Sequence, residues 1–251
     1  MKNNQNTVFL LKLWIPTIIL GSILLYGLFA MIQRGNYIII PVMAIAGIMI
    51  WRTYTSTTAE FNKLLKSSSP QPLIDFYDKK FGKAKIPHKD AHLVFSKAFA
   101  YTLYGYFDSA KAEAGKIQWD QKPPFFQAQH TYLLALWAYL ENHDFQHGAN
   151  LAKEARRLAD ISKSFPGAKA SLNAYDTVMD IGELLSGNSN PSTFARLESK
   201  IKDAPIIMKV LAAWGLEGFY IQSSQAEQAR KMREILTNFA PYCKGLSSIR
   251  N

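Results

Sequence analysis

Two apolar runs near the start constrain the fold of this chain more than any other feature. They span Val8–Ile32 and Tyr37–Trp51, and only the polar residues 33–36 separate them. The 20 residues from Leu13 to Ile32 carry no charge. An α-helix needs about 20 such residues to cross a hydrocarbon core of about 30 Å. A cleaved signal peptide has a shorter apolar region and a small-residue cleavage site, so we expect a transmembrane helix here.

The second run has 15 residues and extends to Tyr54 if Arg52 reaches toward the lipid head groups. A four-residue connection containing Gly35 and Asn36 suits a tight turn between antiparallel helices. The sequence therefore predicts a transmembrane helical hairpin over residues 1–54. Neither span contains Asp, Glu or His, so nothing indicates an ion path through the two helices.

The placement of basic residues predicts the orientation of this hairpin. Arg34 is the one basic residue of the turn between the runs. Basic residues flank the other end of the hairpin at Lys2, Lys12, Arg52, Lys63 and Lys66. By the positive-inside rule, both termini face the cytoplasm. We expect an integral membrane protein, of the kind found in a bacterial inner membrane.

The remainder of the chain has a different composition. No acidic residue precedes Glu60, and residues 52–251 contain 26 basic and 19 acidic side chains. The single cysteine, Cys243, excludes an intrachain disulfide and fits a reducing compartment. A polar, mildly basic domain thus follows the apolar start.

Helical periodicity dominates from Thr55 onward, and no stretch alternates as a strand would. Residues 55–87 are expected to form a juxtamembrane helix and a basic linker, and residues 88–251 a helical domain. Short separators with Gly, Pro, Asn, Asp or Ser divide this domain. The predicted helices span residues 88–104, 108–118, 125–141, 145–160, 167–186, 191–203, 205–221 and 224–239. The fold class is all-α.

Four residues of the first helical hairpin recur 38 residues later. Tyr101, Phe107, Ala110 and Ala114 correspond to Tyr139, Phe145, Gly148 and Ala152. The stretch Phe107–Ala110, with an aromatic three residues before a small residue, resembles the turn into the second helix of a tetratricopeptide repeat. This resemblance covers residues 88–160 and continues weakly to Pro241. It implies an α-solenoid of about four helical hairpins.

Two departures from the tetratricopeptide pattern leave the repeat class open. The period exceeds the usual 34 or so residues, and Leu136 occupies a position where Ala98 matches the small residue of the motif. A generic α-solenoid or an irregular bundle is the alternative.

The resemblance implies that the first helix of each unit lines a concave groove for a partner protein. Lys, Arg and Asn, with which some family members hold a peptide carboxylate, are absent from these positions. An apolar, aromatic groove suits a helix or an extended segment of a partner, although each side chain can instead belong to the core. The expected partner-binding residues are His92, Phe95, Phe99, His130, Leu133 and Trp137.

Five lysines follow the predicted membrane exit at positions 79, 80, 83, 85 and 89. A juxtamembrane cluster attracts anionic lipid by about 1 kcal/mol per charge close to the surface. We therefore expect lipid binding by Lys79, Lys80, Lys83, Lys85 and Lys89. A solvated linker face is the alternative, because Asp78 and Asp90 dilute the charge. Nucleic-acid binding is not expected.

No pattern in the sequence indicates an enzyme. His88 and His92, like His143 and His147, are spaced four apart, but neither pair has the adjacent Glu of a zinc hydrolase. Phosphate-binding, dinucleotide-binding and nucleophile motifs are missing. We expect no catalytic residue, metal or cofactor.

These features predict a membrane-anchored helical-repeat scaffold or subunit that recruits partner proteins at the cytoplasmic face. An enzyme or regulatory enzyme subunit with an unrecognised helical active site is one alternative. A transient assembly factor for a membrane complex is another.

Overall fold

The computed structural model describes residues 59–82, 85–165, 167–188 and 190–247. The chain divides into two units, Met1–Glu60 and Phe61–Asn251, and the fold described here is that of the second. The predicted transmembrane hairpin of residues 1–54 and Lys83 lie outside the described residues. Among the helices that are described, none combines the length and apolar character needed to cross a bilayer.

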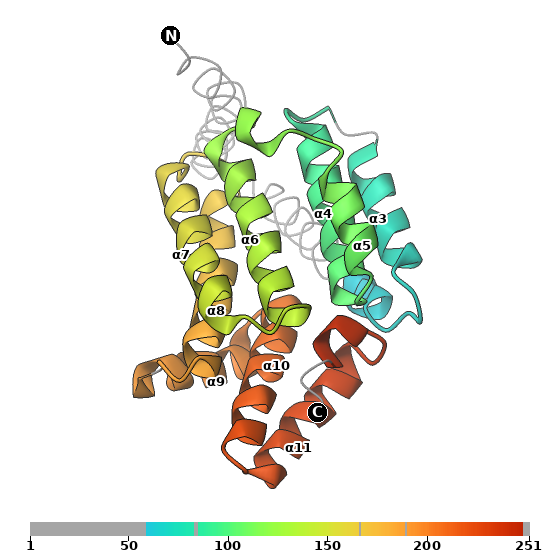
Figure 1. The fold of residues 1–251 in the computed structure, drawn as a ribbon. Coiled ribbons are helices and arrows are strands. Elements are labelled where there is room, and N and C mark those ends of the chain that lie inside the picture. Colours follow the sequence, from blue (N-terminus) through green and yellow to red (C-terminus); the bar gives the residue numbers. More distant parts are fainter. Residues whose placement is uncertain (1–58, 83–84, 166, 189, 248–251) are drawn as a thin grey trace, which may run out of the picture. The chain divides into compact units, whose positions relative to one another are not determined.

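The described part of the chain is all-α, as the sequence predicts, and contains no strand. Figure 1 shows the helices as a sequence of antiparallel neighbours joined by short turns. The α-helices are α3 (Gln71–Gly82), α4 (Lys89–Leu103), α5 (Phe107–Ala114), α6 (Pro124–Leu140), α7 (Phe145–Ile161), α8 (Ala168–Leu185), α9 (Pro191–Asp203), α10 (Ile206–Gln222) and α11 (Ala226–Phe239). Two 3₁₀ turns are η1 (Trp119–Gln121) and η2 (Lys244–Ser247).

Local sequence signals explain where these helices begin. The Asn190 side chain accepts hydrogen bonds from the backbone N–H groups of Ser192 and Thr193, and Pro191 is the first residue of α9. Asp144 accepts from the backbone N–H of His147 at the start of α7. Such caps satisfy N–H groups that have no partner within the helix.

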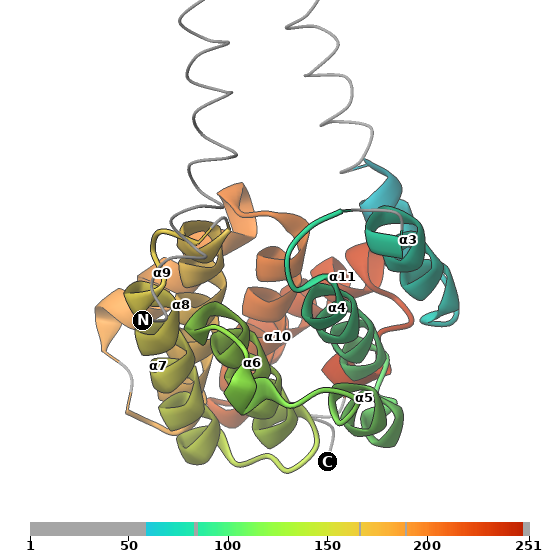
Figure 2. The ribbon, with the colours of Figure 1, turned by 90° about the horizontal axis from the view of Figure 1, so that it is seen from above.

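Helix contacts follow a regular order along the chain. Consecutive helices pair as α4 with α5, α6 with α7, α8 with α9, and α10 with α11. The first helices of successive pairs also contact each other, α4 with α6, α6 with α8, and α8 with α10. Figure 2 shows α10 between α8 and α11, in agreement with these contacts. The unit is therefore a linear succession of helical hairpins, with α3 packed on α4 at its start.

Three of the four hairpin turns share one backbone geometry. In each, a residue with positive φ follows the first helix, and the next N–H bonds back to a carbonyl five residues earlier. This is the pattern of a Schellman motif. The positive-φ residues are Gly105, Gly187 and Ser224, and the bonds run from Tyr106 to Tyr101, from Asn188 to Glu183 and from Gln225 to Tyr220.

Small residues stand where the helices approach most closely. The Tyr139 ring lies against the backbones of Gly148 and Gly182, and a Cβ at either glycine would come within 2.1 Å of that side chain. Ala110 occupies the equivalent of Gly148 in the preceding hairpin and is fully buried, whereas Ala112 is exposed. Ala110 is thus a small residue of the core, as the small position of the motif implies.

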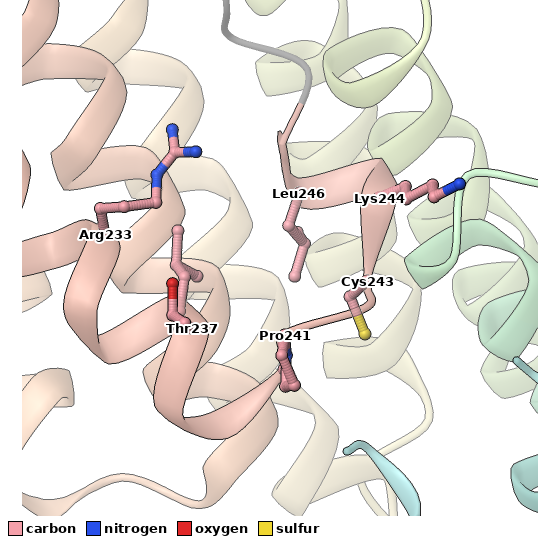
Figure 3. Close-up of a pocket in the computed structure, with 8 residues that line it drawn as sticks. Arg233, Thr237, Pro241, Cys243, Lys244 and Leu246 are labelled. Atoms are coloured by element: carbon pink, nitrogen blue, oxygen red, sulfur yellow. The ribbon is translucent and has the colours of Figure 1, made fainter. Parts of the chain in front are cut away.

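The C-terminal segment after α11 folds back onto the first hairpin. A Cβ at Gly245 would lie 2.4 Å from the Thr102 carbonyl oxygen at the end of α4, so only glycine fits there without a shift. Cys243 and Leu246 are buried. Figure 3 shows this segment facing Arg233 and Thr237 of α11 across a pocket of about 140 Å³.

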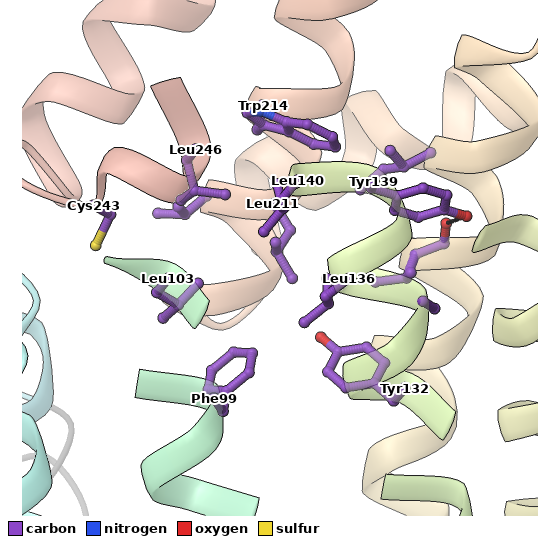
Figure 4. Packing of buried hydrophobic residues seen from close by; sticks show 14 of the residues in the cluster. Phe99, Leu103, Tyr132, Leu136, Tyr139, Leu140, Leu211, Trp214, Cys243 and Leu246 are labelled. Atoms are coloured by element: carbon purple, nitrogen blue, oxygen red, sulfur yellow. Dashed lines mark hydrogen bonds between the residues drawn. The ribbon is translucent and has the colours of Figure 1, made fainter. Parts of the chain in front are cut away.

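The core joins the first helices of the hairpins to this C-terminal segment. Figure 4 shows Leu103 of α4, Leu136 of α6, Trp214 of α10 and Leu246 directed toward one shared interior. A face that an open helical array would leave accessible is thus filled by α10 and by Cys243 and Leu246.

Candidate partner-binding site

Three of the six residues predicted to line a groove belong to the core. Leu133 is completely buried, and Phe99 and Trp137 are each 7% exposed. The Trp137 Nε1–H donates a hydrogen bond to Thr102 Oγ1 of α4 at 2.8 Å. The burial of these three side chains in the core, where α4 contacts α6, contradicts the expectation that they line an accessible groove.

The other three predicted residues, His92, Phe95 and His130, are half-buried. The His92 ring stacks on Phe81 at a centroid distance of 5.7 Å and meets the edge of Phe126 at 4.8 Å. The three half-buried residues lie in the first halves of α4 and α6. This is the end of the unit where α3 ends and η1 precedes α6. We call His92, Phe95 and His130 the aromatic–histidine edge.

The third member of the edge is ordered by a nearby tryptophan. The His130 ring stacks on Trp119 at 5.0 Å with an interplanar angle of 3°. The Trp119 Nε1–H donates to the Ala114 carbonyl at 2.8 Å and so caps the end of α5. Rings held in this way lose little conformational freedom on binding, which favours contacts with an apolar partner.

Burial also determines the charge of this edge. It lowers the pKa of both His92 and His130 from the ordinary value of 6.5. At neutral pH both imidazoles are therefore uncharged. The edge presents apolar and aromatic surface with ring nitrogens as neutral hydrogen-bonding groups.

A cleft of about 300 Å³ adjoins the edge beside His88 and is lined by Ile117, Gln118, Gln121 and Lys122. His88 precedes α4 in the left-handed conformation, with φ of 53°, and its ring lies 5.3 Å from that of Phe126. Burial is also the main cause that lowers the pKa of His88. Within the described residues, no three His, Cys, Asp or Glu side chains gather as a metal site.

The predicted lipid-binding lysines divide into two groups. Lys79, Lys80 and Lys85 are exposed, the first two in the last turn of α3. Lys89 is half-buried, and its Nζ donates to the Gly82 carbonyl at 2.6 Å. Lys89 thus closes the connection between α3 and α4, while the exposed lysines remain accessible to an anionic surface.

Cys243 is buried in the C-terminal segment. Burial raises the pKa of its thiol to about 12. Because the thiolate is the reactive form, this cysteine is a poor nucleophile at neutral pH.

Sequence reasoning missed two ion pairs, each between a buried acid and a partly exposed arginine, that join the helices of the later hairpins. Asp180 of α8, almost fully buried, pairs with Arg196 of α9. Glu217 of α10, also buried, pairs with Arg233 of α11. Glu217 stands among apolar residues such as Trp214 and Tyr220. That setting is a usable signal, since acids are almost never fully buried unless they are paired. Asp180 lies beside Asp176 and Glu183 on α8, so the sequence offers no such signal there.

The distinctive features of this unit are thus its ordered hairpins, its aromatic–histidine edge and its exposed lysines. Neither a known protein family, nor a curated protein, nor a solved structure matches the chain.

Proposed function

We propose that this chain is a membrane-anchored helical-repeat protein, of tetratricopeptide-like design, that recruits partner proteins at the cytoplasmic face of a membrane. The single observation that carries the proposal is the order of helix contacts. Each hairpin packs on the next, and first helices contact first helices from α4 to α10. Helical arrays of this kind commonly bind proteins, and in this unit the aromatic–histidine edge, not the filled inner face, offers the binding surface.

The repeated hairpin turns give independent support. The backbone N–H groups of Tyr106, Asn188 and Gln225 each donate to the carbonyl of the residue five positions earlier. The bond lies at the same point of the first, third and fourth hairpins, as expected of related units, although Schellman motifs also end many helices of other folds. The 38-residue correspondence of Tyr101 with Tyr139 and of Ala110 with Gly148 adds to it.

Sequence supports the membrane anchor. A run of 20 residues without charge satisfies the length requirement of a membrane span, and the second apolar run satisfies it when it extends past Arg52 to Tyr54. Lys79, Lys80 and Lys85 are exposed within 31 residues of Tyr54, where the second span is expected to end. We propose that these three lysines contact anionic lipid.

The aromatic–histidine edge is the surface that we propose for an apolar part of the partner. Its rings are ordered by stacking, and its imidazoles are neutral at physiological pH because burial lowers their pKa. Phe99, Leu133 and Trp137 have a structural role in the core instead.

Crosslinking of the full-length chain in native membranes, followed by mass spectrometry, tests the recruiting function. We expect a small set of proteins that is recovered with the full chain and is lost when the chain is truncated after Glu60. The same set from both chains, or no set above background, would contradict the proposal. Small-molecule turnover by the purified chain would favour the enzyme alternative.

A further inference from the structure

A polar cleft of about 690 Å³ lies over the second and third hairpins, away from the aromatic–histidine edge. Its lining comes from three helices, and four of its side chains are cationic while two are carboxylates. The cations are Lys153 and Arg156 of α7 and Arg196 and Lys200 of α9, and the carboxylates are Asp176 and Asp180 of α8. The cleft is therefore positively charged.

One ion pair, between Arg196 and Asp180, forms part of the cleft lining. Arg196 donates to Asp180 through Nε at 3.0 Å and through Nη2 at 2.5 Å. Two hydroxyl groups of the same helix, those of Ser192 and Thr193, accept further bonds from this guanidinium. Asp180 is almost fully buried and Arg196 is thereby fixed, so this pair joins α9 to α8 rather than serving a ligand.

The other three cations of the cleft retain donor groups that make no short hydrogen bond within the described residues. Arg156 donates through Nε to Asp176 at 2.5 Å, and its terminal amino groups form no hydrogen bond with the described residues. Lys153 has only a long contact of 3.6 Å with Glu183. Lys200 lines the cleft without a hydrogen-bond or ion-pair partner in the described part of the chain.

The spacing of these cations indicates the kind of anion. Residues three or four apart on a helix have Cβ atoms about 5–6 Å apart, as Lys153 and Arg156 do along α7. The third cation, Lys200, stands on a different helix. Charges distributed over two helices match successive carboxylates along an extended chain better than the oxygens of one phosphate group, which surround a single point.

We propose that this α7–α8–α9 cleft binds an acidic segment of the partner protein, with Lys153, Arg156 and Lys200 meeting its carboxylates. The inference rests on the proposed function, because it names the chemistry of the recruited partner. Electrostatic complementarity of this type adds specificity and raises the association rate.

A fluorescein-labelled hexaglutamate peptide is a suitable probe, with hexaglutamine as its neutral control. Fluorescence anisotropy with the full-length chain should show binding of hexaglutamate that weakens with added salt. The double substitution Arg156→Gln and Lys200→Gln should lower this affinity about tenfold. The matched control is Arg157→Gln with Lys169→Gln, which removes two exposed cations that do not line the cleft and should preserve binding.

Three results would overturn the proposal. The first is that hexaglutamate does not bind, the second is that hexaglutamine binds equally well, and the third is that both double variants lose the same affinity for hexaglutamate. If inorganic phosphate or vesicles of anionic phospholipid, and not hexaglutamate, depended on Arg156 and Lys200, the cleft would be a phosphate site.

Crosslinking in membranes separates failure of this inference from failure of the proposed function. If the chain with Arg156→Gln and Lys200→Gln recovered the same partners as the unaltered chain, the proposed role of the cleft in partner binding would be refuted. The recruiting function would stand. If the unaltered chain recovered no partner, the recruiting function itself would be refuted.

Discussion

Trp137 of α6 donates its indole N–H to the Thr102 hydroxyl of α4 at 2.8 Å, in the buried seam between the first two hairpins. Thr102 is completely buried and donates its own hydroxyl hydrogen to the Ala98 carbonyl at 2.8 Å. The two bonds form a short chain that fixes the position of α6 on α4. Trp137 therefore holds hairpins together and is not available to a partner.

Replacing Thr102 by Val should destabilise the helical unit by about 1–3 kcal/mol, because the indole N–H of Trp137 would stay buried without an acceptor. Trp137→Ala should cost more, about 3–5 kcal/mol, through loss of packing. Thr131→Val is the matched control, since Thr131 is partly exposed and its hydroxyl bonds only within α6. Denaturant unfolding of the full-length chain, followed by circular dichroism, measures all three. Equal stability of the two threonine variants would contradict the role of Thr102.

Ala110→Leu should destabilise the first hairpin by about 1–3 kcal/mol, because the added carbons would overpack the core in which Ala110 is buried. Ala110 is completely buried, while Ala112, two residues further on, is exposed. Ala112→Leu should therefore be nearly neutral. Thermal melts compare the two variants, and equal melting temperatures would contradict this role of Ala110 in the core.

Gly148→Ala should destabilise the second hairpin, although alanine normally favours a helix by about 1 kcal/mol over glycine. The new methyl group would lie 2.1 Å from a ring carbon of Tyr139, which is completely buried and cannot move away freely. Gly82→Ala is the control, because nothing lies within 4 Å of a Cβ there. Gly148→Ala should lower the melting temperature relative to the unaltered chain and Gly82→Ala should not. A stabilising Gly148→Ala would contradict the close approach.

The helix boundaries could be predicted from the sequence because short stretches with Gly, Pro, Asn, Asp or Ser separate the helices. Predicted helices 191–203 and 145–160 match α9 and α7 to within one residue, where Asn190 and Asp144 supply caps. The second predicted helix runs to residue 118, whereas α5 ends at Ala114. Trp119, on the following turn, caps that end with its indole N–H, and periodicity alone does not reveal such a contact.

The accessible surface could not be predicted in the same way, because it depends on contacts between distant parts of the chain. Trp137 reaches a hydroxyl 35 residues away. Gly245 lies against the end of α4, more than 140 residues earlier. A repeat pattern assigns one helix face to a groove, but it contains no information on a C-terminal segment that covers that face.

The stability of the unit should fall as the pH is lowered from about 7.5 to 5.5. Burial lowers the pKa of His92 and His130 below the ordinary 6.5, so the unfolded chain binds protons that the folded chain does not. Protonation of these histidines in the unfolded chain therefore favours unfolding as the pH falls through their ordinary pKa of 6.5. His92→Phe, which retains an aromatic ring beside Phe81, should reduce this dependence of stability on pH. Chemical unfolding at several pH values measures the dependence, and equal slopes for His92→Phe and the unaltered chain would contradict this role of His92.

Thiol accessibility in intact cells tests the membrane anchor, on which the recruiting function depends, most directly. Cys243→Ala provides the background, because the native thiol is buried among apolar side chains. In that background, the Asn36→Cys chain should react with a membrane-impermeant maleimide added outside the cell. The Ser68→Cys chain, altered at an exposed position of the helical unit, should react only after permeabilisation. Labelling of the Ser68→Cys chain in intact cells, with protection of the Asn36→Cys chain, would contradict a hairpin anchor that holds the helical unit in the cytoplasm.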